Sequence, residues 1–144
     1  SKKIRSALNA NLKIIYCCGE TLQEREEGSH LKKIQSQLEI LKSLSKEELK
    51  TISIAYEPIW AIGSGNSAQP EEINSIHKLI KDIVQSRFSL LDLHGVIYGG
   101  SVNIENASQI LKEEEVDGAL IGGASLNGEE FAKIANIFNE LKEL

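Results

Sequence analysis

The chain has 144 residues, of which 41% are hydrophobic, so it is long enough for one domain with a substantial core and too short for two ordinary domains. Its formal net charge of −5 is spread along the chain, and the lack of a basic stripe argues against a nucleic-acid partner. No stretch approaches the roughly 18 uninterrupted apolar residues of a membrane span, and the N-terminus lacks the apolar core of a signal peptide. We therefore expect one cytoplasmic domain over residues 1–144, with no membrane partner.

The first predicted elements are a helix and a buried strand. Ile4, Ala7 and Leu8 recur at helical spacing, and an apolar run over 12–18 then ends at a glycine. The chain thus opens inside an apparent helix and contains no methionine, and we expect it to be a fragment. Adjacent residues of a strand point to opposite faces, so Cys17 and Cys18 are expected to be reduced structural thiols rather than a disulfide.

A second helix–strand–helix series follows. Ser45 and Glu48 have the spacing of a capping box, a strand is predicted over 51–57, and Pro70 stands at the first position of a long helix. One face of the helix before Ser45 is predicted from Leu31, Ile34, Leu38 and Leu41. The inward face of the helix after Pro70 is predicted from Ile73, Ile76, Ile80, Ile83 and Val84.

Two more units repeat this plan. Strands are predicted over 95–98 and 118–121, each followed by a glycine pair, with a helix beginning near Asn103 after the first. The last helix carries its apolar residues at Phe131, Ile134, Ala135, Phe138 and Leu141. Four alternations of strand and helix predict an α/β fold with parallel strands and right-handed crossovers. Periodicity alone is compatible both with an open doubly wound sheet and with part of a barrel.

The loops after the strands carry the residues of chemical interest, because ligands bind at the carboxyl ends of parallel strands. The segments 99–101 and 122–125 each combine two glycines with a serine near a helix start, which is typical of anion binding by backbone N–H groups. A tight turn is the alternative explanation for either pair. Two pairs after consecutive strands favour a phosphate site.

Glu57 closes the second strand, and Pro58 then stops the ladder. A strand-end acid paired with a neighbouring Lys or Arg is the simplest interpretation. The segment that follows, Ile59 to Ala68, places large apolar groups in a loop and then adds glycines that can serve as hinges. Such a segment suits a lid over a small ligand, and it favours a chemical role for Glu57.

Four segments, 17–26, 55–65, 98–103 and 117–126, resemble signature segments of the triosephosphate isomerase family in order and spacing. The segment Ala55 to Gly65 resembles the family's signature and mobile lid. The resemblance covers essentially the whole chain and implies the C-terminal half, strands five to eight, of a (β/α)8 barrel. It also implies the glycolytic interconversion of dihydroxyacetone phosphate and glyceraldehyde 3-phosphate, with no metal and no cofactor.

The resemblance assigns roles to individual residues. Glu57 matches the general base, and Leu120 matches an apolar residue over it. The backbone N–H groups that match the phosphate site are those of Gly63, Ser101, Gly122 and Gly123. The lid and latch residues are matched by Trp60, Ala68, Tyr98 and Glu20. Glu20 and Arg25 match an ion pair beneath the lid, while Ser64 and Asn66 replace the commoner Thr and Lys of the lid.

The family's remaining machinery has no counterpart here. The resemblance implies an Asn and a Lys after the first strand and a His and a Glu near the fourth, all outside this chain. His30 and His77 fall in predicted helices and His94 precedes its strand, so none is expected to substitute. We therefore expect a partner in the N-terminal half of the same enzyme, and no activity for this fragment alone. The intact family is homodimeric, but its dimer contacts lie mainly in that other half.

Two other hypotheses remain. A non-catalytic phosphate-binding or assembly half-barrel module would keep the glycine pairs but would need neither Glu57 nor the lid. Another phosphate-binding barrel enzyme, such as one from histidine or tryptophan biosynthesis, would explain the glycine pairs but not the segment from Tyr56 to Gly65.

Overall fold

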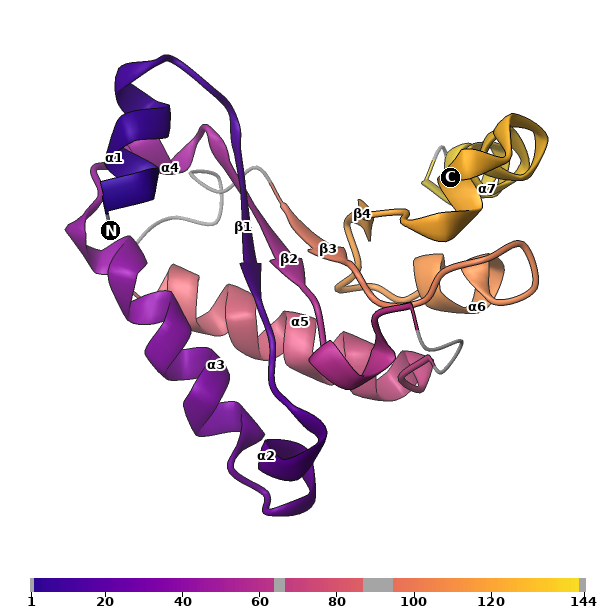
Figure 1. The fold of residues 1–144 in the computed structure, drawn as a ribbon, viewed down its shortest axis with the longest axis horizontal. Coiled ribbons are helices and arrows are strands. Elements are labelled where there is room, and N and C mark those ends of the chain that lie inside the picture. Colours follow the sequence, from indigo (N-terminus) through magenta and orange to yellow (C-terminus); the bar gives the residue numbers. More distant parts are fainter. Residues whose placement is uncertain (1, 64–66, 87–94, 143–144) are drawn as a thin grey trace.

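Four short strands form one parallel sheet in the order β1-β2-β3-β4 (Figure 1). In the computed structural model, which describes residues 2–63, 67–86 and 95–142, they are β1 Ile14–Cys18, β2 Ile52–Tyr56, β3 Val96–Tyr98 and β4 Gly118–Ala119. The predicted parallel order is confirmed, and the order contains no reversal of the kind that a doubly wound sheet requires. Four parallel strands with helices between them are consistent with half of a (β/α)8 barrel.

Helices connect and cover the strands. Their bounds are α1 Lys2–Asn9, α2 Leu22–Glu26, α3 His30–Leu38, α4 Lys46–Leu49, α5 Pro70–Gln85, α6 Ala107–Leu111 and α7 Gly128–Lys142. Three 3-10 turns accompany them: η1 Glu39–Ser43, η2 Ile59–Ala61 and η4 Gly123–Leu126. Within the part of the chain that the structure describes, no helix is long and apolar enough to cross a membrane.

The core lies between the sheet and helices α3 and α5, which Figure 1 shows running alongside the strands. Ile52, Ile54 and Tyr56 alternate along β2 and are all buried there. The strands meet the apolar face of α5, where the predicted Ile73, Ile76, Ile80 and Val84 are buried and Ile83 is partly buried. As predicted, α5 begins at Pro70, and Ser45 and Glu48 form a capping box for α4.

On the other face of the sheet, the described residues leave the side chains of β1 largely uncovered. We call this the inner face and define it by side chains that alternate with the core residues: Ile15, Cys17, Ser53, Ala55 and Ile97. Ile15 keeps 50% of its surface exposed and Cys17 is exposed too, whereas Cys18 on the opposite side is buried. The two adjacent cysteines are free and point to opposite faces, as predicted.

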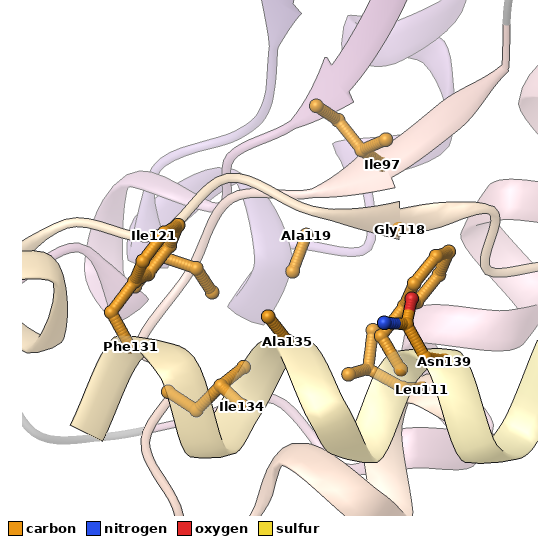
Figure 2. Close-up of a pocket in the computed structure, with 10 residues that line it drawn as sticks. Ile97, Leu111, Gly118, Ala119, Ile121, Phe131, Ile134, Ala135 and Asn139 are labelled. Atoms are coloured by element: carbon orange, nitrogen blue, oxygen red, sulfur yellow. The ribbon is translucent and has the colours of Figure 1, made fainter. Parts of the chain in front are cut away.

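Helix α7 does not bury the whole face that its sequence pattern predicts. Only Ile134 is buried, and Phe131 remains 45% exposed. A cavity of about 270 Å³ separates this face from β3 and β4, as Figure 2 shows. Its lining residues include Ile121, Phe131 and Ala135. The amphipathic pattern of α7 is therefore only partly covered by the strands present.

Two predictions about the helices differ from the structure: the first residue of α6, and the burial of Leu31 on α3. The helix expected near Asn103 begins at Ala107, because the side chain of Asn103 accepts from the N–H of Glu105 and that of Asn106 accepts from the N–H of Asn103. These bonds hold a polar turn in place of the first helical turn. Leu31 is 45% exposed rather than buried, although the other residues predicted for its face are buried.

Candidate functional site

Glu57 lies immediately beyond the carboxyl end of β2, and its side chain is half-buried. Its N–H donates to the carbonyl of Cys18 at 2.7 Å, which continues the β1–β2 ladder by one residue. Glycines stand on both sides. A Cβ atom at Gly19 would lie 1.9 Å from the Glu57 carbonyl oxygen, and one at Gly99 would lie 2.5 Å from its Cγ. Residues at these two positions must lack a side chain for Glu57 to occupy this place.

The thiol of Cys17 faces the Glu57 carboxylate. Burial raises the pKa of this thiol to about 11, and hydrogen bonding to Glu57 and the charge of Glu57 add to the effect. Cys17 therefore remains protonated at neutral pH. Sequence reasoning had treated Cys17 as structural only. The strand register could have indicated the contact, because Cys17 lies opposite Ala55, two residues before Glu57.

A fully buried carboxylate, Glu20, gathers three donors on one oxygen. Its Oε1 accepts from Trp60 Nε1 at 3.0 Å, from the Tyr56 hydroxyl at 3.1 Å and from Arg25 at 3.2 Å. Arg25 also pairs with Glu72 at 2.9 Å and lies 5.3 Å from the centre of the Trp60 ring. The loop after β1 is thus joined to the loop after β2 through Trp60 and to α5 through Glu72.

A second contact joins the far end of the loop after β2 to β3. The N–H of Ala68 donates to the Tyr98 hydroxyl at 3.3 Å, and Ala68 and Tyr98 are both buried. Gly100 leaves room for this hydroxyl, since a Cβ there would lie 2.1 Å from it. Ser64, Gly65 and Asn66 of the expected lid lie outside the described residues.

The four expected phosphate donors follow β2, β3 and β4, and therefore stand at the carboxyl rim of the sheet. Gly63 has a φ of 63°, a left-handed conformation that favours glycine. Gly122 and Gly123 are exposed at the start of η4, and the described residues supply no partner to their N–H groups. Ser101 differs, because its N–H and its hydroxyl both donate to the carbonyl of Ala61, at 3.0 and 2.8 Å.

The remaining residues singled out from the sequence are Leu120 and the three histidines. Leu120 is half-buried at the end of β4, and its N–H donates to the Tyr98 carbonyl at 2.8 Å. His30 and His77 lie in α3 and α5 as predicted, whereas His94 is outside the described residues. Across the described ranges, no cluster of His, Cys, Asp and Glu is placed to hold a metal ion.

The comparisons with known proteins agree with this geometry. The family model described as triosephosphate isomerase matches residues 1–138. The chain belongs to the triosephosphate isomerase family. Its relatives include triosephosphate isomerases of Protochlamydia amoebophila, 44% identical over 96% of this chain, of Finegoldia magna, 43% over 94%, and of Clostridium botulinum, 44% over 94%. Members of this family are glycolytic (β/α)8-barrel enzymes.

The chain spans about half the length of these triosephosphate isomerases. The matched region covers 55% of the Protochlamydia protein and 56% of the Finegoldia and Clostridium proteins. The chain therefore carries only part of the residues with which a complete family member works.

Proposed function

We propose that this chain is the C-terminal half, strands five to eight, of a cytoplasmic triosephosphate isomerase, and that it works when the N-terminal half completes the barrel. The completed protein would interconvert dihydroxyacetone phosphate and glyceraldehyde 3-phosphate. One observation carries the proposal most directly. Glu57 stands at the carboxyl end of a parallel strand between two glycines that leave room for it, in a chain of this family.

In the proposed mechanism Glu57 is the general base. Its carboxylate removes a proton from one carbon of the triose, forming an enediolate, and returns it to the neighbouring carbon, as in the established scheme for this family. Cys17 lies close to this carboxylate on the inner face and, as a neutral thiol, adds no charge beside it. Leu120 would cover the base on its apolar side and limit access of water.

The phosphate of the substrate would be bound by backbone N–H groups of Gly63, Ser101, Gly122 and Gly123. Those of Gly122 and Gly123 are open to an anion, which supports their assignment. Ser101 must first exchange its bonds to Ala61 for bonds to phosphate, so substrate binding and movement of the Ala61 segment are expected to be linked. The contacts Trp60–Glu20 and Ala68–Tyr98 would then act as the latch of the lid.

This half alone should not catalyse the reaction. The enediolate needs a preorganised electrophile, and loss of one such donor typically costs about 10²–10³ in rate. The family resemblance assigns this electrophile to a His near the fourth strand, in the N-terminal half. We expect restored turnover when the purified chain is mixed with an N-terminal half from a family member.

The deciding experiment compares Glu57→Gln with Glu71→Gln in that mixture. Glu71 is an exposed carboxylate in the first turn of α5, and its loss should leave turnover unchanged. Glu57→Gln should abolish turnover without preventing assembly of the two halves. Full activity of the Glu57→Gln mixture would refute the assignment of the base. Phosphate binding with no restored turnover in any mixture would favour the alternative function, a non-catalytic phosphate-binding or assembly module.

A further inference from the structure

The side chain of Gln37 binds both polar backbone groups of Gly19. Its Oε1 accepts from the Gly19 N–H at 3.0 Å, and its Nε2 donates to the Gly19 carbonyl at 3.0 Å. Gln37 lies on α3, whereas Gly19 directly follows β1 and is buried. Buried backbone groups require hydrogen-bond partners, and one amide side chain provides both of them here. Gln37 lies outside the four segments that resemble family signatures, so the resemblance assigns it no role.

Gln37 is itself fixed against β1. Its main-chain carbonyl accepts from the hydroxyl of Tyr16, a residue of β1, at 2.6 Å. On α3, Ile34 one turn earlier and Leu38 directly after Gln37 are buried in the core. The helix backbone at Gln37 therefore has little freedom to move away from the strand. The amide group that binds Gly19 is carried by a backbone already held in place, as a supporting residue of a site requires.

Gly19 in turn holds the backbone of Glu57. The carbonyl of the residue before Gly19 accepts from the Glu57 N–H at 2.7 Å, and the carbonyl of the residue after it accepts from the Ile59 N–H at 2.9 Å. Pro58, between them, has no N–H. Every N–H group of the segment 57–59 is therefore donated to a carbonyl beside Gly19. Gly19 also packs tightly on this segment, since a Cβ on it would lie 1.9 Å from the Glu57 carbonyl oxygen and 3.1 Å from the Pro58 nitrogen.

From these contacts we propose that Gln37 is a positioning residue for Glu57. By fixing both polar groups of Gly19 it fixes the backbone from which the carboxylate projects, and the role of Glu57 as the base rests on the proposed function. A purely structural Gln37 would only satisfy two buried groups, and its loss would lower stability without changing the kinetics of the folded enzyme. A positioning role lowers kcat, because proton transfer requires the base within hydrogen-bond reach of the substrate. It leaves KM nearly unchanged, since three of the four proposed phosphate donors follow β3 and β4.

Gln37→Met tests the proposal in the chain completed with an N-terminal half. Met is as long as Gln and suits a helix, but it has no amide group to bind Gly19. We expect kcat to fall about 10- to 100-fold, as for a small misplacement of a catalytic group, with KM within about twofold. Gln35→Met is the matched control, because Gln35 lies on the same helix with its side chain exposed, and it should leave both constants unchanged. Tyr16→Phe keeps the ring and removes only the bond to Gln37, so kcat should fall by a smaller factor, and this variant decides the question if Gln37→Met fails to fold.

Amide hydrogen exchange gives a second readout that needs no turnover. With isotope labelling of this chain alone, the N–H groups of Gly19 and Glu57 should exchange roughly fivefold faster in Gln37→Met than in Gln35→Met, as for the loss of one hydrogen bond. Unchanged exchange at Glu57, or equal kcat values in these two variants, would overturn the positioning role. A lower stability to urea with unchanged kinetics would overturn it too. If the unmodified pair of halves shows no turnover, the isomerase proposal fails, and exchange at Glu57 still decides whether Gln37 holds that residue.

Discussion

Gly99 forms the wall against which the Glu57 side chain rests, and a Cβ atom at Gly99 would lie 2.5 Å from Cγ and 3.0 Å from Oε1 of Glu57. The first distance is shorter than real Cβ contacts, and the second is at their lower limit. The neighbouring strand β3 therefore determines the position of the carboxylate as strictly as its own strand β2 does.

The first prediction concerns this wall. Gly99→Ala should displace the Glu57 carboxylate by about 1 Å, and a displacement of that size can cost roughly 10² in turnover. The measurement is kcat of the chain completed with an N-terminal half. Gly128→Ala is the control, because a Cβ there meets no atom within 4 Å and Gly128 begins α7 far from Glu57. Equal activity of the two variants would show that the carboxylate is free to choose another position.

The second prediction concerns the buried carboxylate of Glu20. Glu20→Ala leaves Arg25, Tyr56 and Trp60 without their shared acceptor, and breaking a buried charge pair typically costs about 3–5 kcal/mol of stability. Glu129→Ala removes an ion pair with Lys133 on the surface of α7, for which about 0.3–0.5 kcal/mol is expected. Urea unfolding of both variants checks the contrast. Similar losses in the two variants would contradict a structural role for Glu20.

The third prediction separates lid closure from folding. Tyr98→Phe removes the hydroxyl that accepts from Ala68 and keeps the buried ring, so the loss should be about 1 kcal/mol for one neutral hydrogen bond. If the bond holds the lid closed, its loss should destabilise the closed, reactive state by about 1 kcal/mol and lower kcat/KM of the completed enzyme roughly fivefold. The free energy of unfolding should fall by no more than that amount, because the Tyr98 ring and Ala68 keep their packing in the core. A drop in stability with unchanged kcat/KM would assign the bond to the fold instead.

The fourth prediction is a loss of stability in acid caused by His77. Burial lowers the pKa of His77 from 6.5 to about 4. Its Nδ1 is 3.2 Å from the Glu115 carbonyl, while its Nε2 has no hydrogen-bond partner among the described residues. Between these values the unfolded chain binds the proton and the folded chain does not. Stability contributed by neutral His77 is therefore complete above about pH 6.5 and is lost as the pH falls toward 4.

The size of this loss follows from the shift, at roughly 1.4 kcal/mol per pKa unit, and amounts to about 3 kcal/mol near pH 4. Urea midpoints of the unmodified chain and of His77→Gln, measured from pH 7.5 to 4, test it. Gln cannot titrate, so the variant should start less stable and show a shallower decline with acid. Parallel curves for the two proteins would mean that other groups cause the acid dependence.

Much of the fold could be predicted from local patterns. The order of four parallel strands, the start of α5 at Pro70 and the capping box of α4 depend on residues adjacent in sequence, and all three predictions were confirmed. The predicted start of α6 near Asn103 was wrong. The side chains of Asn103 and Asn106 accept backbone hydrogen bonds there and hold a turn in place of the first helical turn. The face of α7 was predicted from its amphipathicity, yet Phe131 stays 45% exposed because the described strands cover only part of that face.

The candidate site shows the same division. Glu57 and the glycine pairs stand out because strand ends and missing side chains are visible in a sequence. The engagement of Ser101 by Ala61 could not be predicted, since it joins two loops through the packing of β2 against β3. The Cys17–Glu57 contact was missed for a related reason. The proximity of these two residues depends on the register of β1 against β2, which places Cys17 opposite Ala55 and so near Glu57.

The protonated state of Cys17 determines how this exposed thiol responds to reagents. With a pKa of about 11, only about one molecule in 10⁴ carries a thiolate at pH 7, and the thiolate is the species that alkylating agents and peroxide attack. Accessibility alone would rank Cys17 as the more vulnerable of the two cysteines. Burial and the neighbouring carboxylate keep most Cys17 thiols protonated, so this residue should react with such reagents far more slowly than an ordinary exposed thiol.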